Sequence, residues 1–184
     1  MKKQILTFGL ISGAILGGAT AVMVALCMND TAAFDYAEIC GYTIQVLAYL
    51  LVFFAIRSYR ESVGGTITFG KAFQVGILAT LVACAVYVVS WEIVYYNFIP
   101  DFGDKYAAHM LERMKAKGES AQAIEKATRE MAKFKEMYKN PFFNTGMTLL
   151  EVFPVGLIMT LISAAILRRK TPPPAPSAAT AAAG

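Results

Sequence analysis

The fold is decided by the stretch AFQVGILATLVACAVYVVSWEIVYYNFI, residues 72–99, in which Glu92 is the one charged residue. Crossing the hydrocarbon of a bilayer takes about 20 mostly apolar residues. Three further stretches meet this requirement: residues 4–28 carry no charge, residues 36–56 carry Glu38 near their start, and residues 142–167 carry Glu151. Backbone groups in lipid must be hydrogen-bonded within the protein, so we expect these stretches to be helices. The sequence therefore predicts an all-α, polytopic membrane protein with four transmembrane helices.

The composition agrees with this class. Of the 184 residues, 57% are hydrophobic and only 16% are charged, and the mean hydropathy is +0.50. Soluble domains are about half apolar and about a quarter charged. The first stretch is about twice as long as the apolar core of a signal peptide, so we expect a retained helix. We expect one transmembrane domain over residues 1–170 and a disordered Pro/Ala-rich tail, TPPPAPSAATAAAG, over residues 171–184.

The distribution of basic residues predicts the orientation. Two lysines precede the first stretch, the loop 57–71 holds three basic residues against one acidic residue, and three basic residues follow the fourth stretch. The positive-inside rule then places both termini in the cytoplasm, and we expect a bacterial cytoplasmic (inner) membrane. The segment 99–140 opposes this orientation, because it holds nine basic residues beside seven acidic ones.

The segment 100–140 has the pattern of helices and not of a plain linker. Pro100 ends the third stretch, Asp104 and Ser120 are suited to cap two new helices, and Gly118 lies between them. Asn140-Pro141 then starts the last stretch. The second new helix has one apolar seam, formed by Ile124, Ala127, Met131, Phe134 and Tyr138. We predict a helical hairpin-like extramembrane insertion between the third and fourth transmembrane helices.

Two interpretations of this insertion stay open. In the first, it is a structural cap whose apolar face packs on the ends of the transmembrane helices, which is the ordinary pattern of a surface helix. In the second, residues 104–138 form a docking surface for a membrane or extracytoplasmic protein partner, or for lipid headgroups. Nucleic acid is not an expected partner, since topology explains the net charge of +4.

Two glutamates within the apolar stretches are candidate functional residues. Glu92 lies 21 residues after Lys71, about 31 Å along a helix, and Glu151 lies 17 residues before Arg168, about 25 Å. Both are therefore expected near the outer edge of the hydrocarbon, with Glu151 the deeper. Ionisable groups inside a membrane usually face the helix bundle and indicate function. The candidate intramembrane polar site consists of Glu151, Glu92, Tyr95, Asn97 and Asn144.

The surroundings of Glu151 allow two interpretations. Pro154 removes a backbone hydrogen bond and tends to kink a helix, and Gly156 follows it, so a cavity or an ion site could form there. Alternatively, Glu151 is a packing residue that accepts hydrogen bonds from neighbouring helices, with Tyr95, Asn97, Asn144 or Thr148 as partners.

Small residues along the first stretch predict close helix packing. Gly9, Gly13 and Gly17 recur at every fourth position, which lets another helix approach closely. We expect this ridge to pack inside the chain, and a homo-oligomer is the alternative. Cys27 and Cys40 flank the turn after this stretch, so a disulfide is an alternative to the free thiols that we expect.

Two motifs resemble a known family. The stretch GGTITFGKAFQVG, residues 64–76, opens the third helix, and EVFPVGLIMTLISAAILRRK, residues 151–170, ends the last one. With four spans and a charged helical loop before the last, the chain resembles the domain of unknown function 4199 family of small bacterial membrane proteins, over about residues 1–170. The resemblance implies a membrane architecture but no activity. The matching positions are Gly65, Phe69, Ala72, Gly76, Glu151, Pro154 and Gly156.

The sequence shows no catalytic constellation. It has no nucleophile with a neighbouring base, no phosphate-binding motif, and three cysteines without metal-ligand spacing, so we expect no enzyme activity, cofactor or metal. The leading hypothesis is a non-enzymatic subunit, scaffold or accessory factor that acts through helix packing and its extracytoplasmic helical cap. The alternative is a small oligomeric transporter or channel that uses Glu151, with or without Glu92, as a proton or cation site. No inverted repeat is evident to support transport.

Overall fold

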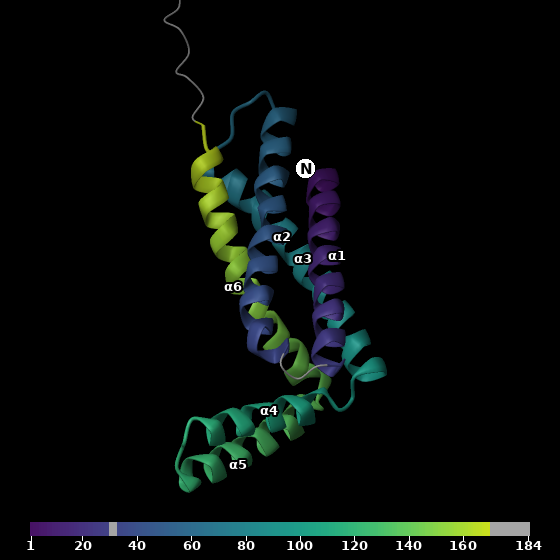
Figure 1. Cartoon of the computed structure of the whole chain (residues 1–184). Coiled ribbons are helices and arrows are strands. Elements are labelled where there is room, and N and C mark those ends of the chain that lie inside the picture. Colours follow the sequence, from purple (N-terminus) through teal and green to yellow (C-terminus); the bar gives the residue numbers. More distant parts are fainter. Residues whose placement is uncertain (30–32, 170–184) are drawn as a thin grey trace, which may run out of the picture.

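The computed structural model describes residues 1–29 and 33–169, and these residues form six helices. The helices are α1 (Lys2–Asn29), α2 (Phe34–Ser62), α3 (Phe69–Phe98), α4 (Phe102–Ala116), α5 (Ala121–Tyr138) and α6 (Pro141–Leu167). Helices α1, α2, α3 and α6 are long and apolar enough to cross a membrane. They stand side by side as a bundle, and α4 and α5 extend sideways from one end of it (Figure 1). The prediction of an all-helical chain with four long apolar helices is confirmed.

Helix α1 packs along α3 through its small residues. A Cβ atom added at Gly9 would lie 2.8 Å from the carbonyl oxygen of Ala79, and one at Gly13 would lie 2.5 Å from the Cβ of Val86. Gly17 faces Ser90 in the same way. The contacts advance along both helices together, so α1 and α3 run parallel. The glycine ridge of α1 thus lies against another helix of the same chain.

Helix α2 runs parallel to α6 in a corresponding manner. Tyr49 lies 2.9 Å from the position of a Cβ added at Gly156, and Arg60 donates to the carbonyl oxygen of Leu167 at 3.4 Å. An isolated β-bridge between Ile67 and Arg169 joins the α2–α3 loop to the residues after α6. The bundle therefore consists of two parallel pairs, α1 with α3 and α2 with α6, that run in opposite directions.

The helix boundaries follow local capping. Ser120 caps α5 by accepting from the backbone N–H of Ala123, and Asn140 caps α6 by accepting from that of Phe142. The expectation that Asp104 caps α4 is wrong, because the helix already begins at Phe102. The carboxylate of Asp104 instead forms an ion pair with Lys135 on α5, which joins the two helices.

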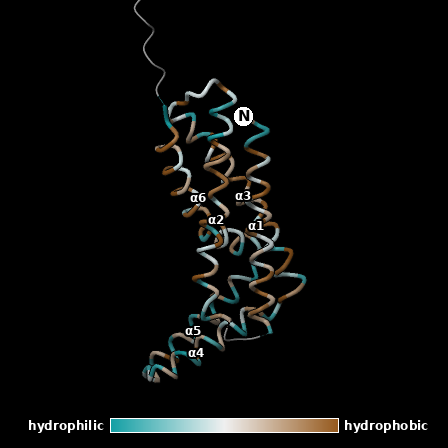
Figure 2. Tube along the Cα trace, turned by 45° about the horizontal axis from the view of Figure 1, so that its top comes forward, coloured by the Kyte–Doolittle hydropathy of each residue, from teal (hydrophilic) through white to brown (hydrophobic). Residues whose placement is uncertain are grey.

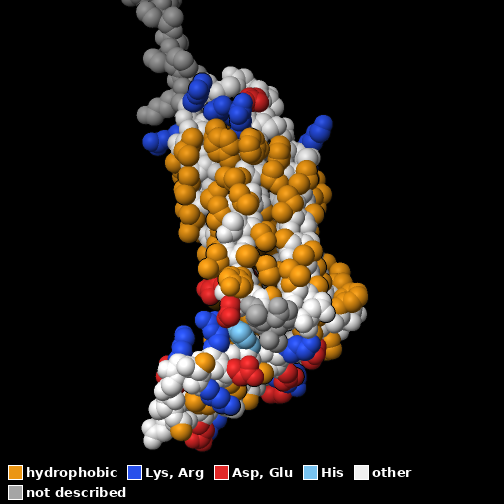
Figure 3. Space-filling view, in the orientation of Figure 1, with side chains coloured by type: hydrophobic (Ala, Val, Ile, Leu, Met, Phe, Trp, Pro, Cys, Tyr) orange, Lys and Arg blue, Asp and Glu red, His pale blue; other side chains and the backbone are white. Residues whose placement is uncertain are grey.

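The polar and apolar surfaces are separated along the bundle axis. Hydrophobic residues cover the middle of the bundle, and hydrophilic residues gather at its ends and along α4 and α5 (Figure 2). On the face shown in Figure 3, lysine and arginine dominate the end near the N-terminus, whereas α4 and α5 carry charges of both signs. The predicted tail, residues 171–184, lies outside the described residues. Cys27, Cys40 and Cys84 are free thiols, so the alternative of a disulfide between Cys27 and Cys40 is wrong.

Candidate functional site

A buried polar cluster joins α3 to the first turns of α6. Trp91 donates its indole N–H to the Oδ1 atom of Asn144 at 2.9 Å, and the Thr148 hydroxyl donates to the backbone carbonyl of Asn144 at 2.9 Å. The side chain of Asn144 is fully buried, and its Nδ2 atom has no partner among the described residues. Because Oδ1 accepts from Trp91, the amide is held in one orientation and Nδ2 is the unmatched donor.

Glu92 is part of the same junction. It is partly buried, and its Oε1 atom accepts a hydrogen bond from the hydroxyl of Thr145 on α6 at 2.9 Å. Glu92 and Trp91, which are neighbours on α3, therefore both form hydrogen bonds to α6. A carboxylate held by a hydrogen bond between two helices contributes to their packing.

Glu151 lies about two helical turns further along α6 than Asn144. Its Oε1 atom accepts a hydrogen bond from the Nε2 atom of Gln45 on α2 at 3.4 Å. Gln45 is only 5% exposed, whereas the side chain of Glu151 is exposed on the surface of the bundle. This partner was not among those that the sequence suggested, because a single neutral amide in mid-helix resembles ordinary packing.

Two other predicted site residues, Asn97 and Tyr95, have partners other than Glu151. Asn97 is exposed and donates to the carbonyl of Ile93 in its own helix at 2.8 Å. Tyr95 is buried in an aromatic cluster, where its ring centroid lies 5.8 Å from that of Trp91 and 5.4 Å from that of Tyr138. The predicted set is therefore split between a buried α3–α6 cluster and a separate α2–α6 pair.

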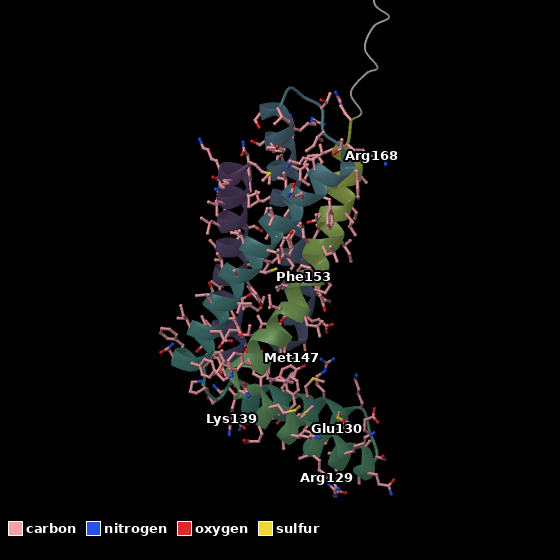
Figure 4. The ribbon with its side chains drawn as sticks, turned by 180° about the vertical axis from the view of Figure 1, so that it is seen from behind. Arg129, Glu130, Lys139, Met147, Phe153 and Arg168 are labelled. Atoms are coloured by element: carbon pink, nitrogen blue, oxygen red, sulfur yellow. The ribbon has the colours of Figure 1, made fainter. Side chains whose placement is uncertain are left out.

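Pro154 and Gly156 lie on different faces of α6. The helix continues without interruption from Pro141 to Leu167, and Pro154 is exposed on its outer face. Gly156 is buried between α2 and α3. Figure 4 shows the course of α6, with Lys139 and Arg168 flanking its two ends.

Helix α5 contributes Tyr138 to the junction. The Tyr138 ring packs against those of Tyr95 and Phe143, and burial raises the pKa of its hydroxyl, with the Glu151 carboxylate adding to the rise. Tyr138 was predicted as the last residue of an apolar seam but not as a neighbour of the polar site. A tyrosine at the end of such a seam can reach polar groups with its hydroxyl.

Helix α4 is attached to the start of α2. Asp35 lies 3.1 Å from the Nε2 atom of His109 and 3.1 Å from the Nη1 atom of Arg113. The ring of Phe34 packs on those of Phe102 and His109, at centroid distances of 5.8 and 5.4 Å. Helix α4 is thus held to the start of α2 along most of its length, from Phe102 to Arg113, by both ionic and aromatic contacts.

The helices α3 and α6 cross through a reciprocal contact at mid-depth. A Cβ added at Gly76 would lie 2.8 Å from the Cγ2 atom of Thr160, and one at Gly156 would lie 2.5 Å from that of Thr80. The hydroxyls of Thr80 and Thr160 are hydrogen-bonded at 2.9 Å, and both residues are fully buried. Thr80 lies nine residues after Lys71, about 14 Å along the helix, which is close to half of the roughly 30 Å that a candidate span has to cross.

A short repeated segment lies at this crossing, on α3 and on α6. Residues 73–86, FQVGILATLVACAV, align with residues 153–166, FPVGLIMTLISAAI, at an offset of 80 residues. Six of the 14 positions are identical: Phe, Val, Gly, Thr, Leu and Ala. Because α3 and α6 run in opposite directions, the two copies of the segment are antiparallel.

The described residues offer no metal site. Among residues 1–29 and 33–169, no group of three or more His, Cys, Asp or Glu side chains is placed to hold a metal ion. The site is instead a set of hydrogen-bonding groups, two of them with an unmatched atom: Asn144 with a donor and Gln45 with an acceptor.

Comparison with known proteins places the chain in a family. A family model described as "Protein of unknown function (DUF4199)" matches residues 7–169. The chain belongs to the DUF4199 family. For this DUF4199 chain, searches of curated proteins and of solved structures found no match. Since the family description carries no activity, function has to be argued from the geometry of the chain itself.

Proposed function

We propose that this DUF4199 chain is a non-enzymatic subunit, scaffold or accessory factor of a bacterial cytoplasmic membrane. In this proposal the four long helices are its membrane anchor. Helices α4 and α5 form an extracytoplasmic hairpin that meets a partner protein.

The observation that carries the proposal is the contrast between the bundle and the hairpin. In the bundle, Asn144, Glu92 and Thr160 all take part in hydrogen bonds between α3 and α6. In the described structure, by contrast, no residue of α4 or α5 is buried. Ile124 and Met131 on the α5 seam are only partly covered. A partly exposed apolar seam on a helix that extends from the bundle is suited to pack against another protein.

The orientation follows from charge. The bundle end away from α4 and α5 carries Lys2, Lys3, Arg57, Arg60, Lys71, Arg168 and Arg169, with Glu61 as the acidic residue among them. Basic residues close to helix ends favour the cytoplasmic side. Both termini are therefore cytoplasmic in this proposal, and the hairpin is outside.

A matched pair of variants tests the docking role. Ile124→Ser with Met131→Ser changes the seam, whereas Lys126→Ser with Glu130→Ser changes an exposed ion pair on the same helix. After gentle extraction from the native membrane, native mass spectrometry is expected to show a stoichiometric partner with the wild type and the control, and none with the seam variant. A partner that stays bound to the seam variant would refute docking through α5.

Replacing residues 104–138 with a short linker separates docking from a structural cap. A bundle that keeps its helicity and its thermal midpoint but loses the partner supports the docking role. A bundle that unfolds supports a cap that stabilises the ends of the transmembrane helices.

The contact of Glu151 with the buried amide of Gln45 favours a second candidate, a small oligomeric transporter or channel, because ionisable groups within apolar helices often mark ion pathways. In this candidate Glu151, with or without Glu92, is the proton or cation site. Glu151→Gln is then expected to abolish a proton- or cation-dependent flux in liposomes while the thermal midpoint stays unchanged. A flux that persists in Glu151→Gln would rule out this site.

A further inference from the structure

The pair formed by Gln45 and Glu151 has an unmatched acceptor. Gln45 uses its Nε2 atom to donate to Glu151, which leaves its Oε1 atom buried and without a partner among the described residues. Leaving a buried carbonyl oxygen without a donor costs about 1–3 kcal/mol. None of the ion pairs of the described residues includes Glu151. The pair therefore holds a carboxylate that lacks an ion-pair partner and an amide oxygen that lacks a donor, and a group that brings hydrogen-bond donors and positive charge would suit both.

The face of α2 that bears Gln45 carries further groups that attract cations, and these lie toward the α4–α5 end of the bundle. Glu38, Tyr42 and Gln45 are spaced at i, i+4 and i+7, so they share one face of the helix. Glu38 is exposed and Tyr42 is 51% exposed. A carboxylate attracts cations, and the face of a tyrosine ring binds them through its π-electrons. A cation arriving from the α4–α5 end thus meets Glu38 and Tyr42 before it reaches Glu151.

The ligand set selects among cations. Calcium takes six to eight oxygen ligands and magnesium takes a near-octahedral set, and neither is provided by one carboxylate and one amide oxygen. An ammonium group, with several N–H donors on one charged atom, matches a carboxylate, an amide oxygen and an aromatic face. We propose that Glu151 and Gln45 bind an ammonium group between α2 and α6, carried by a phospholipid headgroup or by a soluble amine.

This inference goes beyond the accessory role and does not depend on the α5 seam. The ammonium site shares one assumption with the second candidate function, namely that Glu151 binds a ligand. Binding without flux would refute the transporter and leave the ammonium site intact. Loss of a protein partner from the seam variant would leave it intact as well.

The test uses the full chain in nanodiscs of phosphatidylglycerol, which has no amine. Phosphatidylethanolamine is added as a minor lipid in one arm and ethanolamine as a soluble amine in the other, and bound molecules are counted by native mass spectrometry. We expect one retained amine-bearing molecule per chain, and the arm in which it is retained identifies its source. Glu151→Gln is expected to weaken retention roughly ten- to a hundredfold, the value of a hydrogen bond to a charged group.

Two further variants make the result specific. Gln45→Leu removes the unmatched amide oxygen and is expected to weaken retention as well. Glu92→Gln is the control, because Glu92 is held by Thr145 on the other side of α6, and it is expected to retain the amine as the wild type does. Thermal midpoints of all variants show whether they are folded.

Three results would overturn the proposal. One is the absence of amine binding in both arms with the folded wild type. Another is equal retention by the wild type and Glu151→Gln. The third is an infrared band of a protonated carboxyl group that does not change when the amine is added. The band is assigned to Glu151 by its loss in Glu151→Gln. A neutral Glu151 would itself donate a hydrogen bond to Gln45 and would leave no charge for an ammonium group.

Discussion

The hydroxyls of Thr80 and Thr160 lie 2.9 Å apart at the crossing of α3 and α6, and each threonine methyl group lies over a glycine of the opposite helix. The contact is self-complementary. Gly76 meets Thr160 and Gly156 meets Thr80, and the two pairs of positions are equivalent within the repeat. Such reciprocity within one chain is the pattern of a two-fold interface. The centre of the bundle is thus built from two copies of one helical segment that pack face to face.

This crossing predicts a strong difference between two glycines of α6. Gly156→Ala would place a Cβ atom 2.5 Å from Thr80 and 2.9 Å from Tyr49, and overpacking of this kind costs about 1–3 kcal/mol. Gly146→Ala would meet no atom within 4 Å, and alanine favours a helix over glycine by about 0.5–1 kcal/mol. Denaturant unfolding in detergent is expected to show Gly156→Ala destabilised and Gly146→Ala unchanged or stabilised. Equal effects would mean that the crossing is looser than the structure shows.

The elements of the fold could be predicted from sequence because each depends on local properties. Long apolar stretches determine the four long helices, and Ser120 and Asn140 determine where α5 and α6 begin, through hydrogen bonds within one turn. Asp104 does not cap α4, because the helix begins earlier, with Asp101 in the cap position and Asp104 in the first turn. The first available turn after Pro100 was used instead.

The site could be predicted only in part, because it depends on which helices become neighbours. Glu92 and Asn144 both lie at the α3–α6 junction, but nothing in the sequence pairs Glu151 with Gln45 across 106 residues. Most of the positions shared by residues 73–86 and 153–166 carry little information, since Val, Leu and Ala are common in apolar helices. The Gly and Thr positions, spaced by four in both copies, are the informative ones.

The packing of α1 on α3 predicts a second contrast between glycines. Gly13→Ala would bring a Cβ atom to 2.8 Å from the backbone oxygen of Ala83, which cannot rotate away, whereas Gly18→Ala meets nothing within 4 Å. We expect Gly13→Ala to lower the free energy of unfolding by about 1–3 kcal/mol and Gly18→Ala to leave it unchanged or slightly higher. Cross-linking between cysteines placed on α1 and α3 reports whether the helices have separated. Equal cross-linking and stability in the two variants would contradict the close approach.

The Trp91–Asn144 bond predicts a spectroscopic change. Trp91 is the only tryptophan of the chain, so its fluorescence reports on this bond alone. Asn144→Leu would leave the indole N–H buried without an acceptor, at a cost of about 1–3 kcal/mol. We expect a lower thermal midpoint and emission at shorter wavelength, because the indole then has less polar surroundings. Asn97→Leu is the control, since Asn97 bonds only to its own helix, and a shift of the same size in that variant would count against the assignment.

The contacts of Asp35 predict that α4 can be loosened without unfolding the bundle. Asp35→Asn removes the charge that pairs with His109 and Arg113, and exposed ion pairs of this kind contribute up to about 1 kcal/mol. Amide hydrogen exchange in α4 is therefore expected to rise a few-fold, since local opening follows local stability. Exchange in α1, α2, α3 and α6 is expected to stay as it is. Glu125→Gln breaks a pair with Arg129 within α5 and is expected to leave α4 unchanged. If α4 exchanges at the wild-type rate in Asp35→Asn, the ion pairs of Asp35 do not contribute to holding α4 on the bundle.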